Sequence, residues 1–202
     1  WDVTANWSRN KSKVLELAPG VTSLYLAGYS WPQIRIMEGY EYGVVWGYGY
    51  QHNESGELLI GEDGWPLLDD QLKVLGETQQ DWLGSLNTMV RYKAFSLSGL
   101  LDTKQGGKML NFELQYTVSP GKAKITENRG DTYVWEGVNA ETGEKNTIPL
   151  ERNRQFWQKY GQFNLHENMI EDASSVRLRE ATVAFQVPAK LAGRISADNM
   201  TI

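Results

Sequence analysis

The chain has 202 residues, with 20 Lys or Arg against 25 Asp or Glu, which gives a formal net charge of -5. This acidic balance argues against a general nucleic-acid role, because such a role needs a basic surface. The absence of Cys excludes disulfides, thiolate metal sites and Cys nucleophiles. No apolar run of about 18 residues occurs, so no transmembrane helix is predicted. No signal peptide is predicted at the start either.

The first predicted element is a strand over residues 1–8, where apolar residues occupy the odd positions and polar residues the even ones. Residues 18–80 are expected to form a long excursion dense in Gly, Tyr and Trp. Within it, residues 42–50 and 57–60 flank Asn53, Glu54, Ser55 and Gly56, which predicts a β-hairpin.

The most regular pattern lies around Lys93. Alternate positions from Trp82 to Tyr92 form one face, and the alternation resumes at Phe95 and continues to residue 102. Each arm has about the 9–11 residues of a tilted transmembrane strand. Aromatic residues bracket the apolar face, with Trp82 at one end and Tyr92 and Phe95 at the other. This arrangement predicts a transmembrane hairpin with a tight turn at Lys93-Ala94.

A second long excursion is expected over residues 103–172, with a helix-compatible stretch at 151–160 that ends at Gly161. A last strand follows over residues 174–187. Its apolar phase switches near Arg179-Glu180, which predicts a β-bulge there. A short turn is expected at Pro188-Ala189-Lys190, and residues 199–202 look like the start of another strand.

Short turns at one end of the strands and long connections at the other are typical of outer-membrane β-barrels. The predicted fold class is therefore all-β, with antiparallel strands forming part of a transmembrane β-barrel wall and two long extracellular loops. Both ends of the chain resemble cuts through a longer protein.

Six segments of the chain match, in order and spacing, the SusC/RagA family of TonB-dependent outer-membrane transporters, which the chain resembles over essentially its whole length. The matching segments are residues 10–17 (NKSKVLEL), 41–46 (EYGVVW), 80–86 (QDWLGSL), 91–98 (RYKAFSLS), 102–107 (DTKQGG) and 171–183 (EDASSVRLREATV).

The resemblance implies that residues 1–202 are one partial barrel region, from which the plug domain and the final strands are absent. It implies a nutrient importer in the bacterial cell outer membrane that takes up glycans or peptides, not an enzyme. The implied partners are a SusD-like surface lipoprotein, TonB through the missing plug region, outer-membrane lipid and an oligosaccharide or peptide substrate. Nucleic acid is not among them.

Aromatic residues in the first excursion are the candidate ligand-binding residues, because flat rings suit sugar faces. The alternative is that they fold the loop onto itself or onto a partner lipoprotein. The candidates are Trp31, Tyr42, Trp46, Tyr48, Tyr50 and Trp65.

No metal, cofactor or catalytic residue is predicted. An acidic group in the first excursion fits no EF-hand spacing and is interpreted as a solvated loop. Neither His52 nor His166 lies in a sequence context that suggests a catalytic triad. The acidic group comprises Glu62, Asp63, Asp69 and Asp70.

The alternative function is that of a soluble carbohydrate-binding β-domain with an aromatic platform. That hypothesis expects the apolar faces of residues 82–101 to be buried against a second sheet of the same chain. The transporter hypothesis expects no such covering sheet.

Overall fold

The computed structural model describes residues 1–28, 32–195, 197 and 200–202. Its contacts divide the chain into two compact units. Unit 1 comprises residues 1–11, 80–107 and 173–202, and unit 2 comprises residues 12–79 and 108–172. Most strands pair in antiparallel sheets and the described helices are short. None of these helices combines the length and the apolar character needed to span a bilayer.

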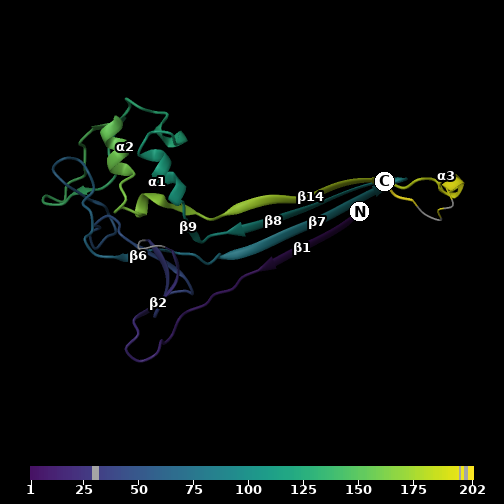
Figure 1. Ribbon diagram of the computed structural model, residues 1–202, viewed down its shortest axis with the longest axis horizontal. Helices are drawn as coiled ribbons and strands as arrows, with labels where there is room; N and C mark the ends of the chain where they lie inside the picture. The colour runs from purple at the N-terminus through teal and green to yellow at the C-terminus, as the bar shows by residue number, and fades with distance from the viewer. Residues whose placement is uncertain (29–31, 196, 198–199) are drawn as a thin grey trace. The chain divides into compact units, whose positions relative to one another are not determined.

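Unit 1 is built on an open antiparallel sheet, called here the long sheet, in which the strand order is β1-β7-β8-β14 (Figure 1). The strands are β1 (Asp2–Ser8), β7 (Trp82–Tyr92), β8 (Phe95–Gln105) and β14 (Ser175–Phe185). β1 and β14 lie at its two edges. The strands expected around residues 1–8, 82–102 and 174–187 are therefore confirmed as strands.

The register keeps apolar residues of neighbouring strands on one face. Leu86 pairs with Ala5 on one side and with Leu101 on the other, and Leu101 in turn pairs with Leu178. The pairing of β14 with β8 shifts between Leu178 and Glu180. The predicted bulge is thus confirmed, and it returns the apolar residues that follow to the same face.

The hairpin turn at Lys93-Ala94 is also confirmed, because Tyr92 pairs directly with Phe95. Lys93 adopts φ 54°, the left-handed conformation that normally favours Gly. The opposite end of the long sheet holds the last residues of β1 and β8 and the first residues of β7 and β14. Both segments of unit 2 are therefore inserted at that opposite end.

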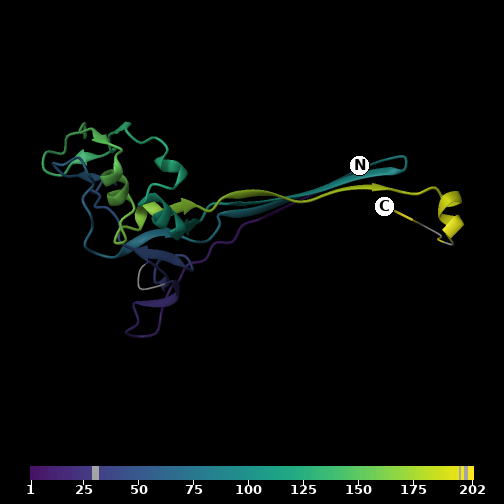
Figure 2. The ribbon, with the colours of Figure 1, turned by 45° about the horizontal axis from the view of Figure 1, so that its top comes forward.

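The expected short turn at Pro188 is wrong. Pro188 instead precedes the short helix α3 (Ala189–Ala192), since its carbonyl accepts from the amides of Leu191 and Ala192. The one-turn helix η3 (Gly193–Ile195) follows, and Met200 lies beside the segment after β14, where its carbonyl accepts from the Val187 amide. Figure 2 shows α3 beyond the end of the strands of unit 1. Ala-Lys-Leu-Ala favours a helical turn over an immediate reversal.

Unit 2 contains a second antiparallel sheet of order β2-β3-β4-β6 and three short strand pairs, one of which is parallel. The strands of the sheet are β2 (Ser23–Gly28), β3 (Gln33–Met37), β4 (Val44–Gly47) and β6 (Lys73–Glu77). The pairs are β5 (Leu59–Ile60) with β11 (Val138–Asn139), β9 (Lys108–Leu110) with β13 (Ile170–Asp172), and β10 (Thr132–Tyr133) with β12 (Leu150–Glu151).

The helices of unit 2 are α1 (Phe112–Val118), the one-turn helices η1 (Lys124–Thr126) and η2 (Glu167–Met169), and α2 (Arg154–Tyr160). The helix expected at 151–160 is present as α2, but it begins only at Arg154, because Glu151 belongs to β12 and Asn153 caps the helix; it ends at Gly161 as predicted. The predicted turn at residues 53–56 is present, since Gly56 and Glu57 bond back to Asn53 and His52 bridges Leu58. The predicted first arm, residues 42–50, is wrong for most of its length, because β4 pairs with β3 and β6 instead of with residues 57–60. Residues of both excursions share one core, which comprises Tyr50, Ile60, Trp135 and Leu165.

Candidate functional site

One face of the long sheet, called here the apolar face, carries large apolar side chains that remain exposed. Val176 and Val183 are each 71% exposed and Leu97 is 57% exposed. A soluble domain seldom leaves so continuous an apolar surface uncovered. Following the strand register, the face comprises Val3, Ala5 and Trp7; Gly84, Leu86, Thr88, Val90 and Tyr92; Phe95, Leu97, Gly99, Leu101 and Thr103; and Val176, Leu178, Ala181, Val183 and Phe185.

Aromatic rings lie at both ends of the apolar face. At the turn end, Tyr92 pairs with Phe95, and the rings of Phe95 and Phe185 approach to 4.9 Å. At the other end, Trp7 pairs with Gly84, and the indole of Trp82 lies over that glycine, where a Cβ atom would meet it at 3.0 Å. Gly84 thus leaves room for a bulky ring at the edge of the face.

The opposite face of the long sheet is predominantly polar. Arg91 pairs with Ser96, and Arg177 pairs with Asp102, so both arginines lie on this polar face. At the bulge, the Arg179 guanidinium donates to the Asp102 carboxylate. The sheet therefore separates an apolar face from a face suited to water or to a polar domain.

The candidate ligand-binding aromatics of the first excursion lie in different environments. Tyr42 is exposed, Trp46 and Tyr48 are half-buried, and Tyr50 is only 3% exposed. Trp31 lies outside the described residues. The ring of Trp65 packs 4.8 Å from that of Phe156, and the Lys159 ammonium lies 4.5 Å from its centre. Ligand contact at these aromatics stays a prediction.

Tyr50 is tied into unit 2 by polar contacts as well as by packing. Its hydroxyl accepts from the Asn168 amide at 2.8 Å, and its own amide donates to the Glu167 carboxylate at 2.8 Å. The Lys73 ammonium donates to its carbonyl. Burial raises the pKa of the Tyr50 hydroxyl, so this group stays protonated at neutral pH. These contacts favour a structural role for Tyr50.

The fold brings one candidate aromatic residue together with two of the predicted acidic residues. A cavity of about 390 Å³ is lined by Tyr48, Leu68, Asp69, Asp70 and Asn164. Asp69 also forms an ion pair with Lys73 at 3.5 Å. The other two acidic residues lie apart from this cavity, and Asp63 bonds to Lys159 at 3.0 Å.

The two histidines are held by different contacts. His166 is 1% exposed, and its Nδ1 accepts from the Tyr48 amide at 3.0 Å, so its proton resides on Nε2. Burial lowers the pKa of His166. His52 lies with its Nε2 3.7 Å from the Glu167 carboxylate. Among the described residues, no group of three His, Cys, Asp or Glu side chains is arranged to hold a metal.

Aromatic residues that the sequence patterning did not single out form much of the second excursion's core. Trp135 packs against Tyr50 and Tyr160 with ring centres 5.6 and 6.1 Å apart, while Phe156 and Trp157 pack with Val118. The spacing of Phe156 and Tyr160, four residues apart on the predicted helix, is the one sequence signal for this cluster.

No protein-family model matches the chain. A curated protein named TonB-dependent receptor P3, from Formosa agariphila, is similar to it, with 24% identity over 218 residues. The similarity covers 96% of this chain and 20% of the relative, so the chain spans about a fifth of the relative's length. This similarity supports only the broad class of TonB-dependent receptors and does not distinguish the SusC/RagA group within it.

Proposed function

We propose that the long sheet is part of the wall of a TonB-dependent outer-membrane transporter of the SusC/RagA type. The observation that carries the proposal is the apolar face, where neighbouring strands expose aliphatic side chains in register while the opposite face is polar. A barrel wall needs this alternation, because lipid covers one face and the lumen the other. The weak similarity to a TonB-dependent receptor supports the same class.

The dimensions of the apolar face fit a bilayer. Trp82 and Tyr92 mark the two ends of β7, which has 11 residues. Ten residue steps of about 3.3 Å give about 33 Å along the strand. At a tilt of about 40°, this length spans roughly 25 Å along the membrane normal, the height of the apolar band of outer-membrane barrels.

The proposed topology follows from the connections. The two-residue turn at Lys93-Ala94 is periplasmic, and the end of the long sheet at which unit 2 is inserted is extracellular, as in barrels with short inner turns and long outer loops. Unit 2 then contributes to recognition of a glycan or peptide and to contact with a SusD-like lipoprotein. TonB acts through a plug domain outside these 202 residues.

The soluble carbohydrate-binding alternative is less well supported. It expects the apolar faces of residues 82–101 to be buried against a second sheet, whereas Val90, Leu97 and Leu101 are all exposed. An aromatic platform in unit 2 would explain the Trp and Tyr content equally well, but it leaves the apolar face without a function.

Single-cysteine labelling of the reconstituted full-length protein tests the proposal, since this part of the chain has no Cys of its own. Val183→Cys and Leu97→Cys place a spin label on the apolar face, and Thr182→Cys and Ser98→Cys place it on the opposite face. We expect labels on the apolar face to be relaxed by oxygen, which concentrates in lipid. Labels at Thr182 and Ser98, on the opposite face, should not be relaxed preferentially by oxygen. Relaxation of the Val183 label chiefly by a water-soluble nickel chelate would contradict a lipid-facing wall.

A second measurement addresses transport itself. We expect the full-length protein to fractionate with outer membranes, and a strain lacking it to lose uptake of its nutrient. Unchanged growth of that strain on every glycan and peptide that the parent strain uses would refute the transport role.

A further inference from the structure

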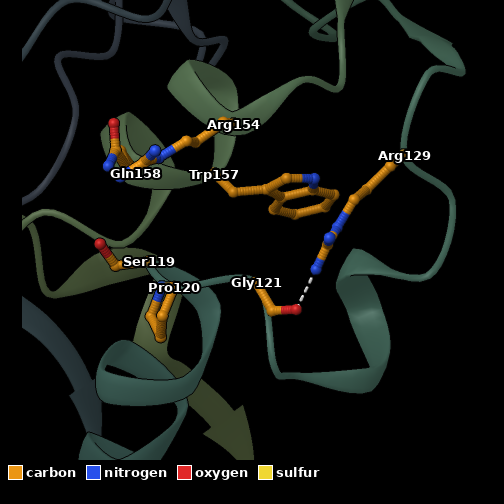
Figure 3. Close-up of a pocket in the computed structure, with 7 residues that line it drawn as sticks. All are labelled: Ser119, Pro120, Gly121, Arg129, Arg154, Trp157 and Gln158. Carbon is orange, nitrogen blue, oxygen red and sulfur yellow. Dashed lines mark hydrogen bonds between the residues drawn. The ribbon is translucent and has the colours of Figure 1, made fainter.

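A cavity in unit 2, called here the arginine cavity, has a lining that carries positive charge and no carboxylate. Its volume is about 500 Å³, within the range of small-molecule sites. Figure 3 shows its side chains, which come from the end of α1, the loop after η1 and the helix α2. The lining comprises Ser119, Pro120, Gly121, Arg129, Arg154, Trp157 and Gln158.

The two polar residues that α2 contributes are placed by the cap of the helix and its buried side. Asn153 accepts from the Phe156 amide at 3.0 Å and so starts the helix at Arg154. Phe156 and Trp157 pack into the core, which leaves Arg154 and Gln158, four residues apart, together on the exposed side. Trp157 is only 3% exposed, and its ring lies between Arg154 and Arg129 in Figure 3.

Arg129 is held against the segment that leaves α1. Its guanidinium donates to the Gly121 carbonyl, as the dashed line in Figure 3 marks. Gly121 has φ 74°, and a Cβ atom there would clash with that guanidinium. The backbone conformation favours glycine at this position, and the missing Cβ leaves room for the Arg129 side chain.

Neither cavity arginine has an ion pair within the part of the chain described. A guanidinium carries five N–H donors, and Arg129 uses one of its groups on Gly121, so most donors remain for a ligand. The planar guanidinium matches carboxylate and other oxyanions through paired hydrogen bonds.

The remaining polar groups of the lining suit hydroxyl-rich molecules. The Ser119 hydroxyl and the Gln158 amide can donate to and accept from sugar hydroxyls, and no described side chain occupies either of them. The buried indole N–H of Trp157 also lacks an acceptor among the described residues. The cavity thus combines donors for an anion with groups that recognise neutral hydroxyls.

We propose that the arginine cavity binds an acidic oligosaccharide, with one carboxylate or sulfate group at Arg129 and another at Arg154, which lie on opposite sides of the Trp157 ring in Figure 3. This inference rests on the proposed function for its biological meaning, since it makes an anionic glycan the substrate class of the transporter. An acidic peptide is the competing ligand, because its carboxylates match the arginines and its backbone amides can bond to Ser119 and Gln158; an oligoglutamate peptide is therefore one of the probes.

Calorimetric titration of the purified full-length protein tests the proposal with matched probes. Oligogalacturonate and its methyl ester differ in the carboxylate, and sulfated and unsulfated dextran oligosaccharides of equal length differ in the sulfate. We expect at least one acidic probe to bind and its neutral counterpart to bind at least tenfold more weakly. The acidic probe that binds identifies the anionic group.

Variants of the cavity assign the binding to these residues. Arg129→Gln and Arg154→Gln should each weaken binding of the acidic probe about tenfold, the cost of losing one charge-assisted contact. Lys122→Gln is the matched control, because it removes one positive charge from the same exposed loop outside the lining. That variant should change affinity less than twofold.

Several outcomes would overturn the proposal. They are equal binding of acidic and neutral probes, equal effects of Lys122→Gln and Arg154→Gln, or binding of an oligoglutamate peptide but of neither acidic sugar. The titration does not depend on where the protein resides. If the protein binds the acidic sugar but the spin labels show no lipid contact, the membrane-wall proposal is refuted and the binding proposal stands. If the labels show lipid contact but no acidic sugar binds, only the binding proposal is refuted.

Discussion

Replacing Leu178 by Arg separates a lipid-facing surface from one that faces water. Leu178 lies on the apolar face of β14, opposite Leu101, which pairs in turn with Leu86. That row lies close to halfway between Trp82 and Tyr92 and hence near the proposed bilayer midplane. Leu178 is 65% exposed, so the structure gives a charged side chain there ample room.

The two environments predict different magnitudes. At a water-exposed position, such a substitution changes the free energy of unfolding by about 0.5 kcal/mol or less. On the lipid face of a barrel, Arg near the midplane costs about 2–4 kcal/mol, and near the interface about 0–1 kcal/mol. We therefore expect Leu178→Arg to be strongly destabilising and Phe95→Arg, at the turn end, to cost little.

The assay is guanidinium unfolding of the full-length protein in phospholipid vesicles, followed by Trp fluorescence. Thr182→Arg is the control for added charge, because Thr182 pairs with Ser98 on the polar face. Equal costs for Leu178→Arg and Phe95→Arg would indicate a protein cover in place of lipid. A cost below about 0.5 kcal/mol for Leu178→Arg would refute the membrane wall.

Three further predictions concern local structure. Lys93→Gly should stabilise the hairpin by about 0.5–1 kcal/mol, since φ 54° strains a residue with a Cβ; unchanged unfolding midpoints would contradict this. Asn153→Ala should cost about 1 kcal/mol and speed amide exchange in α2, while the exposed Gln155→Ala should not. Burial lowers the pKa of His166, so folding opposes its protonation; unit 2 should lose stability as pH falls below about 6.5, measured by amide exchange. His166→Gln should remove that part of the pH dependence, and a variant with an unaltered pH profile would exclude His166 as its source.

Patterns between near neighbours in the sequence predicted much of unit 1. Strict alternation predicted β1, β7 and β8, and the change of phase at Arg179-Glu180 predicted the bulge that keeps β14 in register. The turn at Lys93-Ala94 and the capped helix α2 were predicted for the same reason. These features depend on residues only a few positions apart, and side-chain direction within one strand or helix is fixed by its period.

Features that depend on distant residues were decided only by the tertiary structure. Tyr50 and Trp135 pack together although 85 positions separate them, so the sequence did not reveal that Tyr50 is enclosed. The arginine cavity likewise unites Ser119, Arg129 and Arg154 from three elements. Alternation determined which side of each long strand is apolar. Contacts between segments far apart in the chain determined which aromatic and charged groups are buried and which remain open to a ligand.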